Sequence, residues 1–471
     1  MRPTWLLWSV VLALVGGALV CGGVGLGNED SPPKKILLVA KRAAEAVDQV
    51  EATLEVTGHL KVADAADPGG GKATPLKMGA VATLSYAEKR LSASKSGTAP
   101  LRSVRYYDKA TAAIRVGEEE FKPALREERR LIAVEVALPK ITSFSPRGAL
   151  TREELDLVDL LGNSLLLDRL LPEKSMAAGE SWKHPEAVVA ALVGLDKVTQ
   201  SDATSVLTEM TETGAKIEMT GRVEGSAGGL ASQIELKAKY RFNVKAGRID
   251  WFGLLVKEDR KPGPVGPGLD VVARLQMTIA SRQASAELAQ EALAGLTLGP
   301  TEELCRVECR SPGGVWQLDH DRRWVVVNEH EESTVLRMVD KGDYLAQCNV
   351  VAARQAAPQQ APSLSDFQDE IRSVLDKNFA QFVRAEEFSG ENEEQIYRVE
   401  ADGEVSEVPI HWIHYRIADR QGRRVVVAFT IKEELLERFE EHDKDVIHGL
   451  GFLQPKVAAA KAEGQRGGAG R

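Results

Sequence analysis

The sequence predicts an α+β protein with two folded regions. The first is an N-terminal antiparallel β-rich domain covered by helices, and the second is a C-terminal antiparallel sheet flanked by helices. Long runs of alternating apolar and polar residues are typical of a sheet with one buried and one wet face. Amphipathic segments with capping boxes between these runs predict helices. The 471 residues exceed one ordinary core, and Gly299 and Pro300 place a boundary between the regions.

Residues 1–27 predict a signal peptide. Arg2 precedes an apolar run from Trp5 to Leu26, and Gly25 and Gly27 are small residues suited to the cleavage site. The run is also long enough, at about 20 residues, to remain as an uncleaved membrane anchor. Cys21 offers lipidation as a further alternative, and the sequence does not decide among the three. We therefore expect export to the periplasm or the cell envelope.

Residues 28–50 predict a polar spacer followed by a helix. The spacer is "NEDSPPKK", and Ile36–Val50 carries apolar residues at helical spacing. The apolar positions are Leu37, Ala40, Ala44 and Val47.

Residues 51–298 predict the β-rich domain. The segment "IELKAKYRFNV" alternates most regularly, and "LEVTGHLKV" and "LDVVARLQMTI" follow the same period of two. "RSVRYYDKATAAIRV" predicts two strands that meet around Asp108 and Lys109. The residues expected on the buried face of the most regular strands are Ile234, Leu236, Ala238, Tyr240, Phe242, Val244, Leu269, Val271, Ala273, Leu275, Met277 and Ile279.

Three helices are expected to accompany these strands. Thr151 and Glu154 form a capping-box pattern that opens a helix, with Leu155, Val158, Leu161 and Leu165 at helical spacing. Pro185–Leu195 predicts a second helix, since proline suits a first turn. The alanine-rich segment 280–294 predicts a connecting helix before the boundary.

Residues 299–455 predict the second domain. Four short strands come first, in "GVWQL", "RWVVV", "TVLRMV" and "YLAQCNVV". A helix then begins with Ser365 and Gln368 as a capping box, and "EVPIHWIHYRI" and "RRVVVAFTI" form a hairpin. A final helix is expected near Lys432, with Thr430 and Glu433 as its box. Residues 456–471 predict a disordered tail.

A family resemblance accompanies this order of elements. "VWQLDHDRRWVVV" and the succession of strands, helix, strands and helix over Leu304–Leu453 resemble the photosystem II extrinsic subunit P (PsbP-like) family. That resemblance implies an antiparallel sheet flanked by helices. "LRSVRYYDKA", "LTREELDLVD" and "LLPEKSMAAGESW" resemble segments of uncharacterised exported bacterial proteins of the planctomycete type. Neither resemblance implies an activity that can be assigned to particular residues.

Three cysteines follow the leader, and export permits disulfides. If "LCRVEC" is a strand, Cys305 and Cys309 lie about 13 Å apart and cannot bond to each other. Either could reach Cys348, and Cys309 with Cys348 is the pair we take as the candidate disulfide. A zinc site would favour a closer pair and a fourth ligand.

No catalytic, metal or cofactor site is predicted. His411 and His414 stand three apart on an expected strand, so they face opposite sides and do not share a metal. The clusters Asp319–Asp321 and Glu329–Glu331 lie at opposite ends of another strand, about 20 Å apart, and each is typical of a solvated turn.

The functional hypothesis follows from these absences. A net charge of −9 argues against nucleic-acid binding, which requires a basic surface. We expect a non-enzymatic exported envelope protein that acts by binding or as an interaction component, with an unknown protein or apolar ligand as partner. The alternatives are a periplasmic carrier of a lipid or other apolar ligand, and a hydrolase with an unrecognised site. The carrier alternative requires that the segment 152–171 leave the apolar face of the sheet open as a cavity.

Overall fold

The structure is a computed structural model that describes residues 34–42, 45–63, 73–91, 99–263, 266–283, 285–340, 343–353 and 363–453. The expected signal peptide and the expected C-terminal tail from 456 lie outside these residues. No helix in the described residues is both long and apolar enough to cross a membrane.

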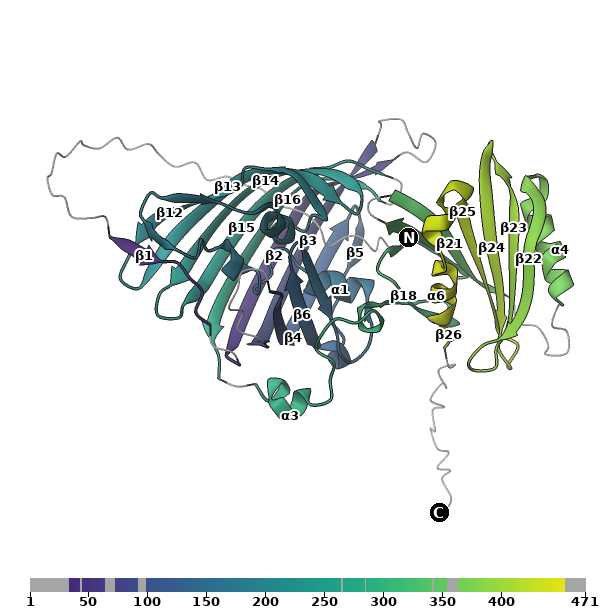
Figure 1. Ribbon diagram of the computed structural model, residues 1–471, viewed down its shortest axis with the longest axis horizontal. Coiled ribbons are helices and arrows are strands. Elements are labelled where there is room, and N and C mark those ends of the chain that lie inside the picture. Colours follow the sequence, from purple (N-terminus) through teal and green to yellow (C-terminus); the bar gives the residue numbers. More distant parts are fainter. Residues whose placement is uncertain are drawn as a thin grey trace, which may run out of the picture.

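Most of the N-terminal region is one curved antiparallel sheet (Figure 1). Within the described residues it has 13 strands, in the order β10-β12-β13-β14-β15-β16-β2-β3-β4-β6-β7, with β11 paired to β13 and β5 to β4. Its strands are β2 (Val47–Ala63), β3 (Ala73–Arg90), β4 (Leu101–Val116), β5 (Glu119–Phe121), β6 (Leu131–Ala137), β7 (Lys140–Phe144), β10 (Ser181–Lys183), β11 (Lys197–Ser201), β12 (Thr204–Met210), β13 (Gly214–Ala227), β14 (Leu230–Asn243), β15 (Arg248–Arg260) and β16 (Gly268–Ser281).

The alternation of apolar residues builds this sheet as the sequence predicts. In β14 and β16 the expected inward residues are buried from Ile234 to Phe242 and from Leu269 to Ile279, whereas Val244 is exposed. The break expected at Asp108 is wrong, because β4 runs through it as one strand. A shift of register between β3 and β4 at Tyr86 absorbs the change of phase there.

Short helices occupy the concave face of the sheet. They are α1 (Arg152–Val158), the 3₁₀ turn η2 (Leu167–Leu170) and α2 (Glu186–Val193), and their leucines and valines belong to the same apolar core as the strands. The capping box of Thr151 and Glu154 is confirmed. Pro185 is the residue that precedes α2, as its fixed backbone angle favours. The concave face is therefore filled by side chains from these helices.

The C-terminal region is built on a second antiparallel sheet (Figure 1). Its order is β19-β20-β21-β25-β24-β23-β22, and its strands are β19 (Trp324–Glu329), β20 (Ser333–Asp340), β21 (Asp343–Ala353), β22 (Phe379–Ser389), β23 (Gln395–Val405), β24 (Val408–Ala418) and β25 (Arg424–Lys432). One face packs on α4 (Leu364–Leu375) and the other on α5 (Leu436–Phe439) and α6 (His442–His448).

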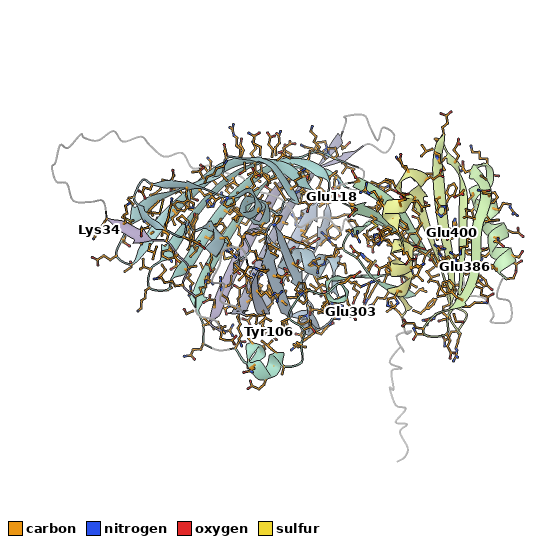
Figure 2. The ribbon with its side chains drawn as sticks, viewed as in Figure 1. Lys34, Tyr106, Glu118, Glu303, Glu386 and Glu400 are labelled. Carbon is orange, nitrogen blue, oxygen red and sulfur yellow. The ribbon has the colours of Figure 1, made fainter. Side chains whose placement is uncertain are left out.

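A small sheet connects the two regions. Its order is β26-β18-β17-β8, from β8 (Leu150–Thr151), β17 (Val307–Arg310), β18 (Trp316–His320) and β26 (Leu450–Phe452). β17 pairs in parallel with β8, and Arg126 contacts both Glu154 and Glu308. In Figure 2, Glu303 of η4 (Glu303–Cys305) lies between the two large sheets. The remaining elements are β1 (Lys35–Leu37), β9 (Ser175–Ala177), η1 (Glu127–Arg129), η3 (Ala286–Leu288), α3 (Gln290–Leu293), η6 (Asp376–Asn378) and η7 (Glu433–Leu435).

The predicted fold class is wrong. The protein is β-rich, since 58% of the described residues are in strands and 16% in helices, and its several sheets are open and mostly antiparallel, not α+β with helix-covered domains. The physical reason lies in helix length. α1 and α2 have 7 and 8 residues, so they fill a core without covering a sheet as wide as this one.

Several predicted helices are also wrong. The segment 36–50 forms the end of β1, a connection and the start of β2, and the segment 280–294 ends β16 and then makes only η3 and α3. The capping box of α4 is Ser363 with Asp366, two residues earlier than expected. The last helix is three short pieces without the expected box. β22 and β23 are missing from the sequence prediction altogether.

Candidate ligand-binding pocket

A pocket of about 390 Å³ opens where α1, α2 and the turn between β18 and β19 meet. Its volume falls within the usual range of small-molecule sites, which is about 300–1,000 Å³. Leucine, isoleucine, alanine and proline side chains form just over half of the wall, and charged groups from both regions of the chain are set into it. The lining residues are Pro139, Lys140, Ile141, Arg152, Leu155, Asp156, Asp159, Leu160, Leu161, Ala190, Ala191, Gly194, Leu195, Asp196 and Arg322.

Helix α1 brings two of the carboxylates into the pocket. Asp156 and Asp159 are three residues apart, so they share one side of the helix end. Arg152 Nε donates to Asp156 Oδ1 at 2.9 Å, one helical turn away. Burial raises the pKa of Asp156, and the Arg152 guanidinium opposes that rise. Arg152 and Asp156 therefore satisfy each other in the pocket wall.

Asp159 has a weaker partner. Its Oδ1 accepts a hydrogen bond of 3.3 Å from the hydroxyl of Ser143, on β7. Burial raises the pKa of Asp159, and Arg322 is the strongest opposing influence. Among the described residues Asp159 has no ion pair. A carboxylate in this setting can accept further hydrogen bonds or hold a cationic group.

Arg322 enters the pocket from the C-terminal region. Its Nε donates to the carbonyl of Cys305 at 2.5 Å, and its Nη2 donates to the carbonyl of Ser143 at 2.8 Å. Burial lowers the pKa of Arg322, and Cys305 and Asp159 oppose that change. Within the part of the chain that the structure describes, no carboxylate forms an ion pair with this guanidinium. Backbone carbonyls thus fix the position of a half-buried positive charge without neutralising it.

The histidines of the sequence prediction do not meet this pocket. His411 Nδ1 is 2.7 Å from Asp402 Oδ1, and its Nε2 is 3.6 Å from Glu400 Oε2. His414 lies on the opposite face of β24, and its burial lowers its pKa to about 4. The clusters Asp319–Asp321 and Glu329–Glu331, each with a histidine between two acids, also lie apart, because His320 ends β18 and His330 follows β19. In the described residues no three His, Cys, Asp or Glu side chains form a group that could hold a metal ion.

The cysteines lie at and beyond the junction. All three are free thiols in the structure, Cys305 half-buried and Cys309 and Cys348 buried. Cys309 and Cys348 belong to the same apolar core. Burial raises the pKa of Cys348, and Cys309 is a further cause of that rise.

The sequence prediction missed every charged residue of the pocket. Asp156 and Asp159 do carry a signal, because both acids interrupt the leucine-rich run "ELDLVDLLG" on one side of a capped helix. Arg322 has no comparable signal. It stands in "DHDRRW", a segment typical of an exposed turn.

Comparisons with known proteins give only weak likenesses. No family model matches the chain, and no curated protein matches it. Among solved structures, cyanobacterial PsbP from Synechocystis sp. PCC 6803 is 12% identical, with 31% of this chain and 92% of that chain covered and a TM-score of 0.26. A Pseudomonas aeruginosa protein of unknown function is 12% identical, with 32% and 97% covered and a TM-score of 0.22. OccK5 from P. aeruginosa is 9% identical, with 82% and 96% covered and a TM-score of 0.12.

Part of the expected resemblance is therefore present. The chain has a weak structural likeness to PsbP-like folds over about a third of its length. The expected planctomycete-type origin and the expected export stay predictions.

Proposed function

We propose that this protein is an exported, non-enzymatic binding protein and that the pocket between α1, α2 and Arg322 is its ligand site. The observation that carries the proposal is the pocket of about 390 Å³ with Asp159 and Arg322 set into its partly apolar wall, neither of them in an ion pair with another described residue. Binding sites commonly combine an apolar wall with a few fixed polar groups, and they favour the junctions between domains. Export rests on the leader at Arg2–Leu26.

The same packing argues against a carrier of a large lipid. A carrier would need an empty apolar face, and here Leu165, Leu166 and Leu170 are fully buried against the concave face of the sheet. The pocket described above lies at one end of this core, and its volume suits a small ligand.

The test is a matched pair of pocket-filling variants. Ala191 lines the pocket from α2, and Ala187 lies on the same helix outside it. We expect the apolar sulfonate dye ANS to bind the folded protein, Ala191→Trp to abolish that binding, and Ala187→Trp to leave it unchanged. Thermal melts establish that each variant is folded. Equal ANS binding by the wild type and a folded Ala191→Trp protein would refute the site.

A further inference from the structure

Some of the charged side chains that line the pocket are already bound to a partner in the protein, and others can still bind a charged group of a ligand. Arg152 and Asp156 bind each other, and Asp196 Oδ2 accepts a hydrogen bond of 2.6 Å from the backbone N–H of Gly228. Lys140 is exposed, and Asp159 and Arg322 are the half-buried acid and the half-buried base that remain. A ligand that carries both signs of charge could satisfy both groups.

Ser143 holds these two groups beside each other. Its carbonyl accepts from Arg322 Nη2 at 2.8 Å, and its hydroxyl donates to Asp159 Oδ1 at 3.3 Å. Each group also influences the pKa of the other, as charges do at close range. Nevertheless Asp159 and Arg322 form no ion pair with each other. The acid and the base therefore both hydrogen-bond to Ser143 and lie as neighbours in the pocket wall.

The apolar part of the pocket wall favours a ligand that also carries an apolar group. Ile141, Leu155, Leu160 and Leu161 line the same cavity as the two charges. The three positive and three negative lining side chains balance, so the pocket as a whole favours neither an anion nor a cation.

We infer that the pocket binds a small zwitterion with an apolar side chain, a free amino acid or a short peptide, with its ammonium group at Asp159 and its carboxylate at Arg322. This inference rests on the proposed function. Each charged end makes charge-assisted hydrogen bonds, and the apolar side chain packs on the leucines. Removal of either end of the ligand leaves one half-buried charge of the pocket without that partner.

The experiment is titration calorimetry on the full mature protein with four probes. L-leucine and Leu-Leu carry both charges, isoamylamine lacks the carboxylate, and isocaproate lacks the amine. We expect leucine or Leu-Leu to bind at least about tenfold more tightly than either singly charged analogue, as expected for loss of one charge-assisted bond. Tighter binding of leucine assigns the site to free amino acids, and tighter binding of Leu-Leu assigns it to peptides.

A pair of variants locates the ammonium group. Asp159→Asn should weaken the binding of leucine by about tenfold or more, since it removes the partner of the ammonium, and should leave isocaproate unaffected. Asp202→Asn is the matched control, because it makes the same change on a carboxylate outside the pocket, one that accepts a hydrogen bond from the backbone N–H of Arg222. Equal losses in both variants would place the ammonium elsewhere and overturn the inference.

The probes also separate this inference from the proposed function. Equal affinities for leucine, isoamylamine and isocaproate would overturn the inference that the ligand is a zwitterion. Failure of all four probes to bind would overturn it as well. If ANS binding still depends on Ala191 in either case, the pocket remains a ligand site for another class of molecule. If Ala191→Trp affects neither ANS nor leucine, both proposals fail.

Discussion

Arg105 Nε donates to Glu88 Oε1 at 2.8 Å, and the two side chains are only 2% and 1% exposed. The pair joins β3 to β4 deep in the N-terminal core. Arg105 Nη2 continues to Asn163 and Ser164, in the connection between α1 and η2. One ion pair therefore fixes the segment that carries the pocket helix against the sheet.

Glu88→Gln should strongly destabilise the N-terminal region. Loss of one partner leaves Arg105 as an uncompensated buried charge, at a cost of about 3–5 kcal/mol in the free energy of unfolding. Urea denaturation measures the change. Asp259→Asn is the control, since Asp259 pairs with Lys61 at the surface and should cost under about 1 kcal/mol. Similar losses in the two variants would contradict the structural role of the buried pair.

Acid should destabilise the protein well above the pKa range of exposed carboxylates. Burial lowers the pKa of His184, His320 and His414 from 6.5 to about 4. The unfolded chain binds protons there that the folded protein does not, so stability falls as pH drops from about 6.5 to about 4, by up to about 3 kcal/mol for each histidine.

His414→Leu tests this pH dependence, because His414 Nε2 has no hydrogen-bond partner in the structure. The urea midpoint of the variant should depend less steeply on pH between about 6.5 and 4. His330→Leu, at an exposed position, should leave the slope unchanged. The hypothesis fails if the two variants have the same pH profile as the wild type.

Glu88 should contribute a second, lower acid transition. Burial alone would raise its pKa, but Arg105 and Arg90 reverse that effect and lower it from 4.5 to about 2. Its contribution is therefore complete above about pH 4.5 and is lost as pH falls toward 2. The Glu88→Gln protein should lack this part of the acid unfolding curve, followed by circular dichroism. An unchanged curve below pH 4.5 would show that other carboxylates control it.

A fragment from Thr301 to Leu453 should fold by itself. It contains its own apolar core around Trp316, Trp324 and Phe429. Its melting temperature should be lower than that of the full chain, because it lacks β8 and Arg126, the partners of β17 and Glu308. Circular dichroism should show one cooperative thermal transition. A fragment without a transition would mean that the boundary near Gly299 is misplaced.

If the protein is exported as proposed, Cys309 and Cys348 should form a disulfide. Both are buried in the same core, and an oxidising compartment favours the bond between nearby thiols. Alkylation under denaturing conditions followed by mass spectrometry should label Cys305 alone. Cys305→Ser should leave the pairing unchanged. Complete labelling of Cys309 and Cys348 without a reductant would exclude the bond.

The sequence predicts the strands far better than the helices. Alternation in β14 and β16 is unambiguous because one face meets a core and the other meets water. Segments 36–50 and 280–294 contain many alanines, which fit a helical period as well as a strand period. Pairing with distant strands decides the structure of the parts that join β2 and β16. β22 has mostly exposed residues, so it offers little apolar pattern to detect.

The pocket could not be predicted from the sequence, for a different reason. Asp159 and Ser143 are near each other in sequence, but Arg322 reaches them only because β17 pairs with β8. A parallel pairing between such distant segments leaves no local pattern in either of them. The composition of each segment, an acidic helix end and a basic turn, indicates solvent exposure until the fold brings them together.

The pairing of β2 with β16 also governs how the protein is made. One edge of β2 pairs with β3, which follows it directly, while the other edge pairs along its whole length with β16. During synthesis that second edge stays open until the far end of the N-terminal region emerges, on the order of tens of seconds at about 5–20 residues per second. An open edge of this length is a template for pairing with another chain. The order of synthesis therefore leaves β2 exposed to aggregation until β16 pairs with it.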